Sequence, residues 1–178
     1  MTVRRREFLC LSAAVTASAC LIPKAGLAIP TQGRALSLFD PRRYEALDIE
    51  YWTNGWYIPD AMARLNHFMR DWRTDDVIDI DPNLLDILYV LQQRTGTRER
   101  LHLVSGYRSP QSNAYLAARS RGVARNSYHI YGRAADITVP DYNLAGLRQL
   151  ALSLEAGGVG YYPRSDFVHV DTGPVRNW

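Results

Sequence analysis

An aspartate inside a short apolar stretch places the strongest constraint on what this chain can fold into. Asp136 lies within the apolar segment 134–139, and His169 lies similarly within the segment 167–170. Both segments have the length and composition of single β-strands. Burying a lone carboxylate in a strand is costly unless a cation or hydrogen-bond donors compensate its charge. The folded chain must therefore bring a compensating partner to Asp136.

The first 28 residues have the three parts of a secretory signal. Arginines at positions 4–6 precede an apolar stretch at 9–22, and small residues at 25–28 suit a signal peptidase. The apolar stretch is too short and too rich in alanine for a good membrane span. The sequence RREFL at 5–9 resembles the twin-arginine type of signal, with an ordinary secretory signal as the alternative. We expect export to the periplasm, a flexible leader at 29–35 and one domain at 36–178, without a transmembrane span.

Removal of the signal changes the charge and the cysteine content. Segment 1–28 holds four of the 21 basic residues and one of the 18 acidic residues, so 17 of each remain and the net charge is zero. A nucleic-acid partner, which needs a basic patch, is not expected. Cys10 and Cys20 are both in the signal, so the mature domain has no thiol to oxidise in the periplasm. Small residues before Cys20 leave a lipid anchor there as a minority alternative.

Helical and strand patterns occupy different parts of the domain. Two apolar or alternating runs, 35–39 and 46–52, flank a turn and predict a β-hairpin. Spacing of apolar residues predicts helices opening at Pro59, Pro82 and Pro110, the last of them ending at Gly122, and a fourth at 144–154. Short strands are expected at 101–104, 134–139, 159–162 and 167–170. This pattern predicts an α+β fold, with a small antiparallel sheet and helices packed on one side of it.

Two histidines and the strand aspartate form the candidate metal site. His129 lies in a polar loop seven residues before Asp136, and His169 lies in the last predicted strand. An exported hydrolase without cysteines binds zinc through histidine and carboxylate, and three protein ligands leave a fourth place for water. We expect one Zn²⁺ ion there. His67 lies on the first predicted helix and is interpreted as a structural or exposed residue. His102 has no carboxylate at ligand spacing and is not interpreted as a ligand.

The sequence resembles a known family, the YcbK-like murein endopeptidases, which are relatives of the zinc D-Ala-D-Ala carboxypeptidases and dipeptidases. The resemblance spans about residues 36–178 and includes the hedgehog/DD-peptidase type of fold. Four blocks carry it, namely SGYRS at 105–109, SYHIYGRAADI at 127–137, GVGYY at 158–162 and FVHVD at 167–171. The implied activity is hydrolysis of peptide bonds in peptidoglycan stem peptides or cross-links.

The resemblance also implies roles for individual residues. His129, Asp136 and His169 match the metal ligands; Asp166 matches the catalytic base that would take a proton from the attacking water. Arg108 matches an arginine that binds substrate or stabilises the oxyanion. Ser127 matches a motif serine, which is expected to form a hydrogen bond beside the ligand loop.

The identity of the base stays open at this point. On a regular strand Asp166 and His169 point to opposite faces, whereas Asp171 and His169 share one. Asp171 is therefore the alternative base, or a partner that orients a ligand histidine.

The alternatives to a murein endopeptidase are a D-Ala-D-Ala-type carboxypeptidase, a non-catalytic peptidoglycan-binding domain and a signalling or structural protein on the same scaffold. The bond cut and the oligomeric state do not follow from the sequence.

Overall fold

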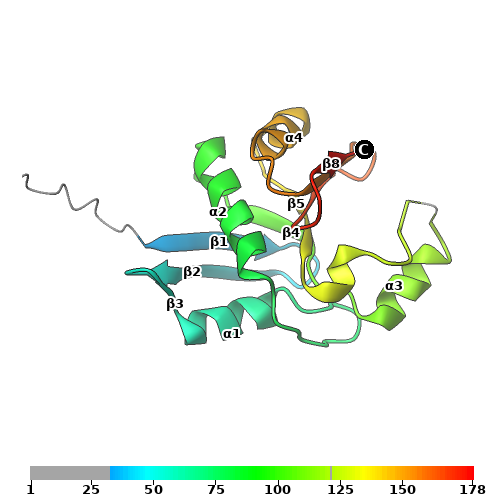
Figure 1. Ribbon diagram of the computed structural model, residues 1–178, viewed down its shortest axis with the longest axis horizontal. Coiled ribbons are helices and arrows are strands. Elements are labelled where there is room, and N and C mark those ends of the chain that lie inside the picture. Colours follow the sequence, from blue (N-terminus) through cyan, green and yellow to red (C-terminus); the bar gives the residue numbers. More distant parts are fainter. Residues whose placement is uncertain (1–32, 121) are drawn as a thin grey trace, which may run out of the picture. The chain divides into compact units, whose positions relative to one another are not determined.

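One mixed sheet of eight strands forms the framework of the residues that this computed structural model describes, 33–120 and 122–178 (Figure 1). The strands lie in the order β3-β2-β1-β4-β5-β7-β6-β8. Their bounds are β1 Arg34–Asp40, β2 Glu45–Thr53, β3 Trp56–Tyr57, β4 Leu101–Ser105, β5 Ala134–Thr138, β6 Gly158–Tyr162, β7 Phe167–Asp171 and β8 Arg176–Asn177. Two pairs, β1 with β4 and β6 with β8, are parallel, and the other pairs are antiparallel. The α+β class is confirmed, but the sheet is larger than predicted and is not purely antiparallel.

The predicted hairpin forms from β1 and β2. Leu36 and Leu38 point into the core, and the residues between them are more exposed, which is the period-two pattern of a sheet with one buried face. At the turn the buried Asp40 carboxylate accepts the backbone N–H groups of Arg42 and Arg43, at 2.8 and 3.2 Å. This carboxylate fixes the turn, because an aspartate side chain that accepts from the following backbone replaces strand hydrogen bonds.

The four predicted helices are present, and local signals explain their ends. Their bounds are α1 Pro59–Phe68, α2 Pro82–Thr95, α3 Pro110–Ala117 and α4 Leu144–Ser153. Asp81 and Ser109 cap α2 and α3 through their side chains, and a proline follows each cap. Gly96 ends α2 in the left-handed conformation, with φ of 64°. Only α3 differs clearly from expectation, because it ends at Ala117 and not near Gly122.

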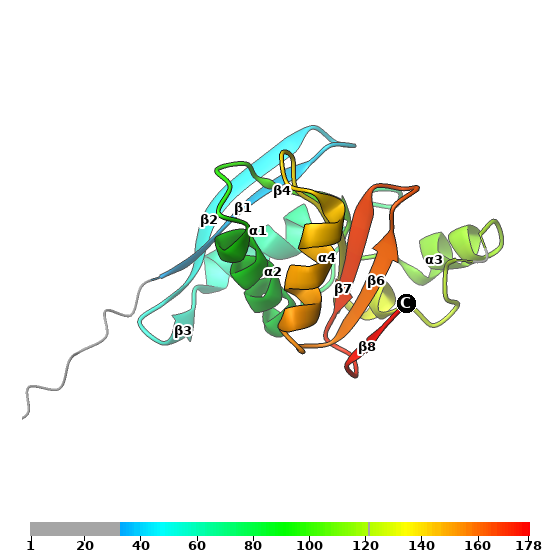
Figure 2. The ribbon, with the colours of Figure 1, turned by 90° about the horizontal axis from the view of Figure 1, so that it is seen from above.

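The two faces of the sheet have different contents. Helices α1, α2 and α4 share one buried hydrophobic cluster with the strands, to which β5 and β7 contribute Ile137, Val168 and Val170. Figure 2 shows these helices grouped together, with α3 apart from them. Because side chains alternate along a strand, Asp136 and His169 point to the opposite face. The candidate site therefore lies on the face of the sheet that the main helices leave uncovered.

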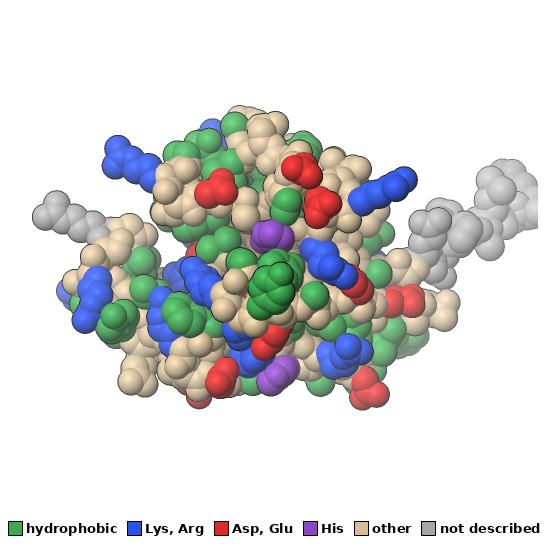
Figure 3. All heavy atoms as spheres, turned by 180° about the vertical axis from the view of Figure 1, so that it is seen from behind, with side chains coloured by type: hydrophobic (Ala, Val, Ile, Leu, Met, Phe, Trp, Pro, Cys, Tyr) green, Lys and Arg blue, Asp and Glu red, His purple; other side chains and the backbone are tan. Residues whose placement is uncertain are grey.

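Charged side chains do not mark the site by themselves. Figure 3 shows basic and acidic side chains scattered over one face, with hydrophobic side chains between them. Buried polar residues are therefore the better guide to function.

Among the described helices, none combines the length and the hydrophobicity needed to cross a membrane.

The predicted signal at 1–28, the candidate lipid anchor Cys20 and the leader up to residue 32 lie outside the described residues. The end of the predicted leader does not match the structure, because Arg34 and Ala35 already belong to β1. The ordered fold thus begins slightly before residue 36, and the type of signal stays a prediction.

Truncation of a core leucine should destabilise the fold without touching the candidate site. Leu88 of α2 has 0% of its surface exposed, so Leu88→Ala should lower the free energy of unfolding by about 2–5 kcal/mol. Urea unfolding followed by circular dichroism measures this change. Val77→Ala, at a residue that is 51% exposed, is the control and should cost well under about 1 kcal/mol. Equal effects of the two variants would contradict the assignment of the core.

Candidate metal centre

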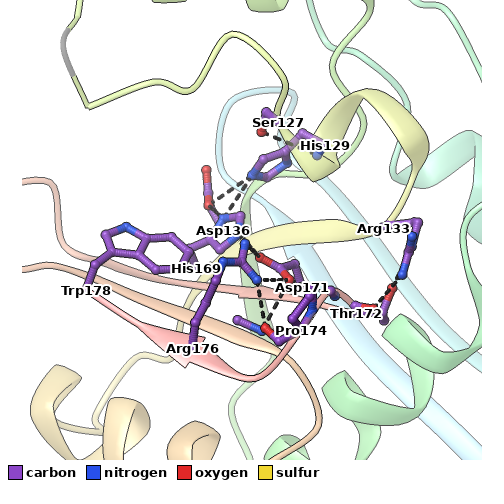
Figure 4. A network of polar contacts seen from close by, with 12 residues as sticks. Ser127, His129, Arg133, Asp136, His169, Asp171, Thr172, Pro174, Arg176 and Trp178 are labelled. Carbon is purple, nitrogen blue, oxygen red and sulfur yellow. Dashed lines mark hydrogen bonds and ion pairs between the residues drawn. The ribbon is translucent and has the colours of Figure 1, made fainter.

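Three side chains predicted as metal ligands meet at one point of the sheet. His129 comes from the short 3₁₀ helix Tyr128–Tyr131 (η1), Asp136 from β5 and His169 from β7 (Figure 4). All three are buried, and one potential ligand atom from each lies within 4.8 Å of the other two. Asp136 Oδ1 lies 3.2 Å from His129 Nε2 and 2.8 Å from His169 Nδ1, and these two nitrogens are 3.2 Å apart. The predicted convergence is therefore present.

Sheet register and one glycine produce this convergence. Asp136 and His169 are directly paired across the antiparallel strands β5 and β7, so their side chains leave the same face side by side. His129 reaches them because η1 ends at Gly132, whose φ is 64°. A Cβ at Gly132 would lie only 2.6 Å from the backbone oxygen of Asp79. Only glycine combines this left-handed conformation with such close backbone approach.

The hydrogen bonds of the two histidines determine which nitrogens face the centre. His129 Nδ1 donates to the backbone oxygen of Gly106 at 2.6 Å, which leaves the lone pair of Nε2 directed at Asp136. His169 Nε2 donates to Asp171 Oδ2 at 2.9 Å, which leaves its Nδ1 directed at the same carboxylate. Three acceptor atoms thus face one another, an arrangement that a shared cation stabilises. The residues present therefore fit a metal ion.

When no metal ion is bound, a proton on His169 supplies the positive charge beside the Asp136 carboxylate. Burial lowers the pKa of His169, but its hydrogen bonds to Asp136 and Asp171 outweigh burial and raise the pKa overall. Burial lowers the pKa of His129 and keeps that ring neutral. Burial alone would raise the pKa of Asp136, yet the donors His169 and Arg108 hold this pKa well below its usual value. A metal ion must displace the proton of His169, so acid should oppose metal binding.

Arg108, predicted to act on the oxyanion, lies at the edge of the centre. Its Nη2 donates to Asp136 Oδ2, the carboxylate oxygen that does not face the histidines, and its Nε donates to Ser105 Oγ at 2.9 Å. Ser105 and Asp136 are partners across β4 and β5, so the sheet itself holds this guanidinium in place. Arg108 thus presents a fixed positive charge beside the centre, as an oxyanion-stabilising group requires.

Ser127 and Asp171 both have supporting contacts. Ser127 caps η1, and its hydroxyl accepts from the backbone N–H of His129 at 3.4 Å. Asp171 is buried against His169 and also accepts two hydrogen bonds from Arg176, at 2.8 and 3.0 Å. These contacts are those expected of a partner that orients His169, the second of the two roles predicted for Asp171.

Asp166, the predicted base, is placed differently from the other candidates. It is exposed in the turn between β6 and β7, with a φ of 53°, and forms no hydrogen bond or ion pair to another described residue. The left-handed conformation bends the chain just before β7, as the sequence required if Asp166 and His169 were to act together. Its neighbours Ser165 and Phe167 line the cavity beside the metal centre, but Asp166 itself does not. The catalytic role of Asp166 therefore stays a prediction.

A cavity of about 460 Å³ opens onto the metal centre and contains residues that the sequence did not single out. His129, Asp136 and His169 line it, together with Arg42, Trp72, Arg73, Arg176 and Trp178. For Arg176 and Trp178 the only sequence signal was position, since both follow the FVHVD block within seven residues of Asp171. His102 lies outside the centre and packs against Phe39 with ring centroids 5.0 Å apart, and His67 also lies elsewhere, as expected.

Loss of the charge on Asp171 should weaken metal binding without removing a ligand. Asp171→Asn should lower metal affinity about 10- to 100-fold, because His169 loses the carboxylate that fixes its tautomer and raises its basicity. Competition with a chromophoric chelator measures the change. Asp141→Asn, at an exposed residue with φ of 60°, is the matched control. An unchanged affinity in Asp171→Asn would remove Asp171 from the metal centre.

Comparison with known proteins gives the family. The family described as "Peptidoglycan L,D-endopeptidase MepK" matches residues 29–178. Proteins named peptidoglycan L,D-endopeptidase MepK from Escherichia coli K12 and Shigella flexneri are each 46% identical over 175 residues, which cover 98% of this chain and 96% of theirs. A probable peptidoglycan L,D-endopeptidase MepK from Haemophilus influenzae is 40% identical over 161 residues, or 89% of this chain and 87% of its own. With its resemblance to the murein endopeptidases confirmed, this chain belongs to the MepK family of peptidoglycan L,D-endopeptidases.

Proposed function

We propose that this protein is a zinc-dependent peptidase that cleaves L,D peptide bonds in peptidoglycan, most directly those of cross-links. The sequence left the type of linkage open, and the names of the relatives give it for those proteins as L,D. Near-complete coverage of both chains supports the transfer, because site and scaffold are matched together. One Zn²⁺ ion is the proposed cofactor.

The observation that carries this proposal is the meeting of three potential ligand atoms, one each from His129, Asp136 and His169. Two imidazole nitrogens and one carboxylate oxygen form a donor set that zinc prefers. With bonds of about 2.0–2.1 Å, ligand atoms of a tetrahedral zinc site lie roughly 3.3 Å apart. The separations of 2.8–3.2 Å in this structure are close to that value.

The catalytic steps assign separate tasks to residues of this chain. Zinc bound in such a site polarises a carbonyl group and activates water near neutral pH. Arg108 lies beside Asp136 and would stabilise the negative charge that develops on the substrate oxygen. We propose Asp166 as the base that takes the proton from the attacking water and returns it to the leaving amine. For that, its side chain must turn from solvent into the adjoining cavity.

Two alternative functions are supported less well than an endopeptidase by the site of this chain. A carboxypeptidase acting on the end of a stem peptide would use the same zinc chemistry, so only the products separate it from an endopeptidase. A non-catalytic peptidoglycan-binding domain needs no complete ligand set. Against this alternative, the chain contains His129, Asp136 and His169. The hydrogen-bond partners of the two histidines, Gly106 and Asp171, are also in place.

The proposed substrate implies a place outside the cytoplasmic membrane. We propose export through the twin-arginine-type signal at 1–28 to the periplasm, with attachment through a lipid at Cys20 as the alternative. Absence of cysteine after residue 28 suits an oxidising compartment. Fractionation of cells that carry the Arg5→Lys, Arg6→Lys signal would separate the export routes.

Replacement of Asp136 should abolish both metal binding and catalysis. Asp136→Ala should take up no zinc and should release no product from purified peptidoglycan, because a ligand and its charge are gone. Elemental analysis and mass spectrometry of muropeptides measure the two effects. Asp60→Ala, at an exposed position of α1, is the control. Wild-type product release by Asp136→Ala would refute the proposed site.

Replacement of Asp166 tests the proposed base separately. Asp166→Asn should lower kcat about 10²- to 10⁴-fold while zinc content and melting temperature stay as in the wild type. Because Asp166 is exposed, its replacement should leave the fold intact, and the melting temperature checks this directly. Full activity would exclude Asp166 as the base.

A further inference from the structure

The cavity at the metal centre is strongly positive. Four arginines line it, Arg42, Arg73, Arg108 and Arg176, whereas Asp136 is the single acidic residue among its described lining residues. A cavity lined by charge of one sign attracts substrates of the opposite sign. The bound metal adds further positive charge. The substrate that enters is therefore expected to carry negative charge near the scissile bond.

The four arginines fall into two pairs with different contacts. Arg108 donates to Asp136, and Arg176 donates to Asp171, so both guanidinium groups already have carboxylate partners. Neither guanidinium group of Arg42 or Arg73 forms a hydrogen bond or ion pair with a described residue. These two arginines thus offer free N–H donors to a molecule in the cavity.

One tryptophan holds the two free arginines together. The Cζ atom of Arg73 lies 4.0 Å from the centre of the Trp72 ring, and that of Arg42 lies 5.2 Å from it. Arginine stacked on an aromatic ring keeps the N–H groups at the edge of its plane available. Burial lowers the pKa of both Arg42 and Arg73, against the opposing charges of Asp40 and Asp71. The positive charge of Arg73 also lowers the pKa of Arg42, so these two cations lie close enough to repel one another. An anion placed between them would relieve this repulsion.

Buried aspartates fix the backbone under both arginines. Asp40 accepts the N–H of Arg42 at 2.8 Å, and Asp71 accepts that of Arg73 at 2.9 Å. Asp71, with 0% of its surface exposed, also accepts the N–H of Ser109 at 2.8 Å, next to Arg108. Asp71 thereby attaches the segment that carries Arg73 to the segment that carries Arg108. Both arginines are exposed residues, but their backbone is fixed by these aspartates and their guanidinium groups lie over Trp72, which lowers the entropy cost of binding a ligand.

Arg43 shows what a structural arginine looks like in the same turn. Its guanidinium donates to the backbone oxygens of Phe68 and Arg70 and pairs with Asp40 at 2.8 Å. It thereby connects the hairpin turn to the end of α1. Of the two consecutive arginines, Arg43 therefore serves the fold, and Arg42 is left for the cavity.

We infer that Arg42 and Arg73, stacked on Trp72, bind a free carboxylate of the peptide substrate. This inference rests on the proposed function and names the group recognised at the same site. In an L,D bond the amine comes from a D-configured residue, and when that residue is an α-amino acid with an unlinked carboxyl group, a carboxylate lies one carbon from the scissile nitrogen. Paired guanidiniums bind such a carboxylate through charge-assisted hydrogen bonds. We assign the site to this carboxylate on the leaving side of the bond.

Two synthetic peptides and a double variant test the assignment. The peptides share one L,D bond and differ only in the leaving D-residue, whose carboxyl group is free in one and amidated in the other. Wild-type zinc-loaded protein should cleave the free-carboxylate peptide with the higher kcat/KM. In Arg42→Gln/Arg73→Gln this kcat/KM should fall about 10- to 100-fold, chiefly through KM, and the value for the amidated peptide should change little.

A matched variant controls for loss of charge alone. Arg98→Gln removes an exposed arginine that does not line the cavity, and both peptides should be cleaved as by the wild type. Zinc content and melting temperature should be equal in all three proteins, since neither free guanidinium supports the fold. Equal losses on both peptides, or no loss on either, would overturn the carboxylate site while leaving the peptidase intact. Failure of the wild type to cleave either peptide would instead overturn the proposed function, and the subsite with it.

Discussion

The charge of Asp136, buried in the middle of the sheet, is the constraint on which the rest of the site depends. A carboxylate at this depth is tolerated because His169 and Arg108 donate to it, and a bound metal would be shared with His129 and His169. Each of these partners is fixed by a second contact of its own. Gly106 orients His129, and Ser105 orients Arg108. Stability and chemistry thus rest on the same set of contacts.

Alternation of side chains along β5 and β7 separates the core from the site. Ile137 and Val168 enter the hydrophobic cluster beneath α2 and α4, while Asp136 and His169, their neighbours in sequence, face the cavity. A rigid packed layer therefore lies directly behind the metal centre. Rigid support of this kind keeps ligand atoms at fixed separations, which metal sites require. Glycine at 158 serves the same end, because a Cβ there would lie only 2.6 Å from Asp171 Oδ2.

Local sequence patterns predicted most of the elements, and their failures have physical causes. Proline with a capping side chain determined the start of α2, and the left-handed Gly96 its end, because both act within one turn of the chain. The mixed character of the sheet was missed. The parallel pairing of β1 with β4 joins Leu38 to Leu101, and no local signal reports a contact across more than sixty residues. The early end of α3 at Ala117 was missed because the breaker Gly122 lies beyond a segment that the pattern read as helical.

The sequence by itself predicted the three side chains that converge at the candidate metal centre, because a lone carboxylate and a histidine in apolar strands need a shared partner and the motif blocks contain all three residues. It also determined the α+β class. Only the tertiary structure decided that Asp171 orients His169 and that Arg42 and Arg73 share Trp72, since these contacts join residues through space. The physical reason is that backbone periodicity sets which face a side chain takes, whereas its partners on that face are set by how distant segments pack.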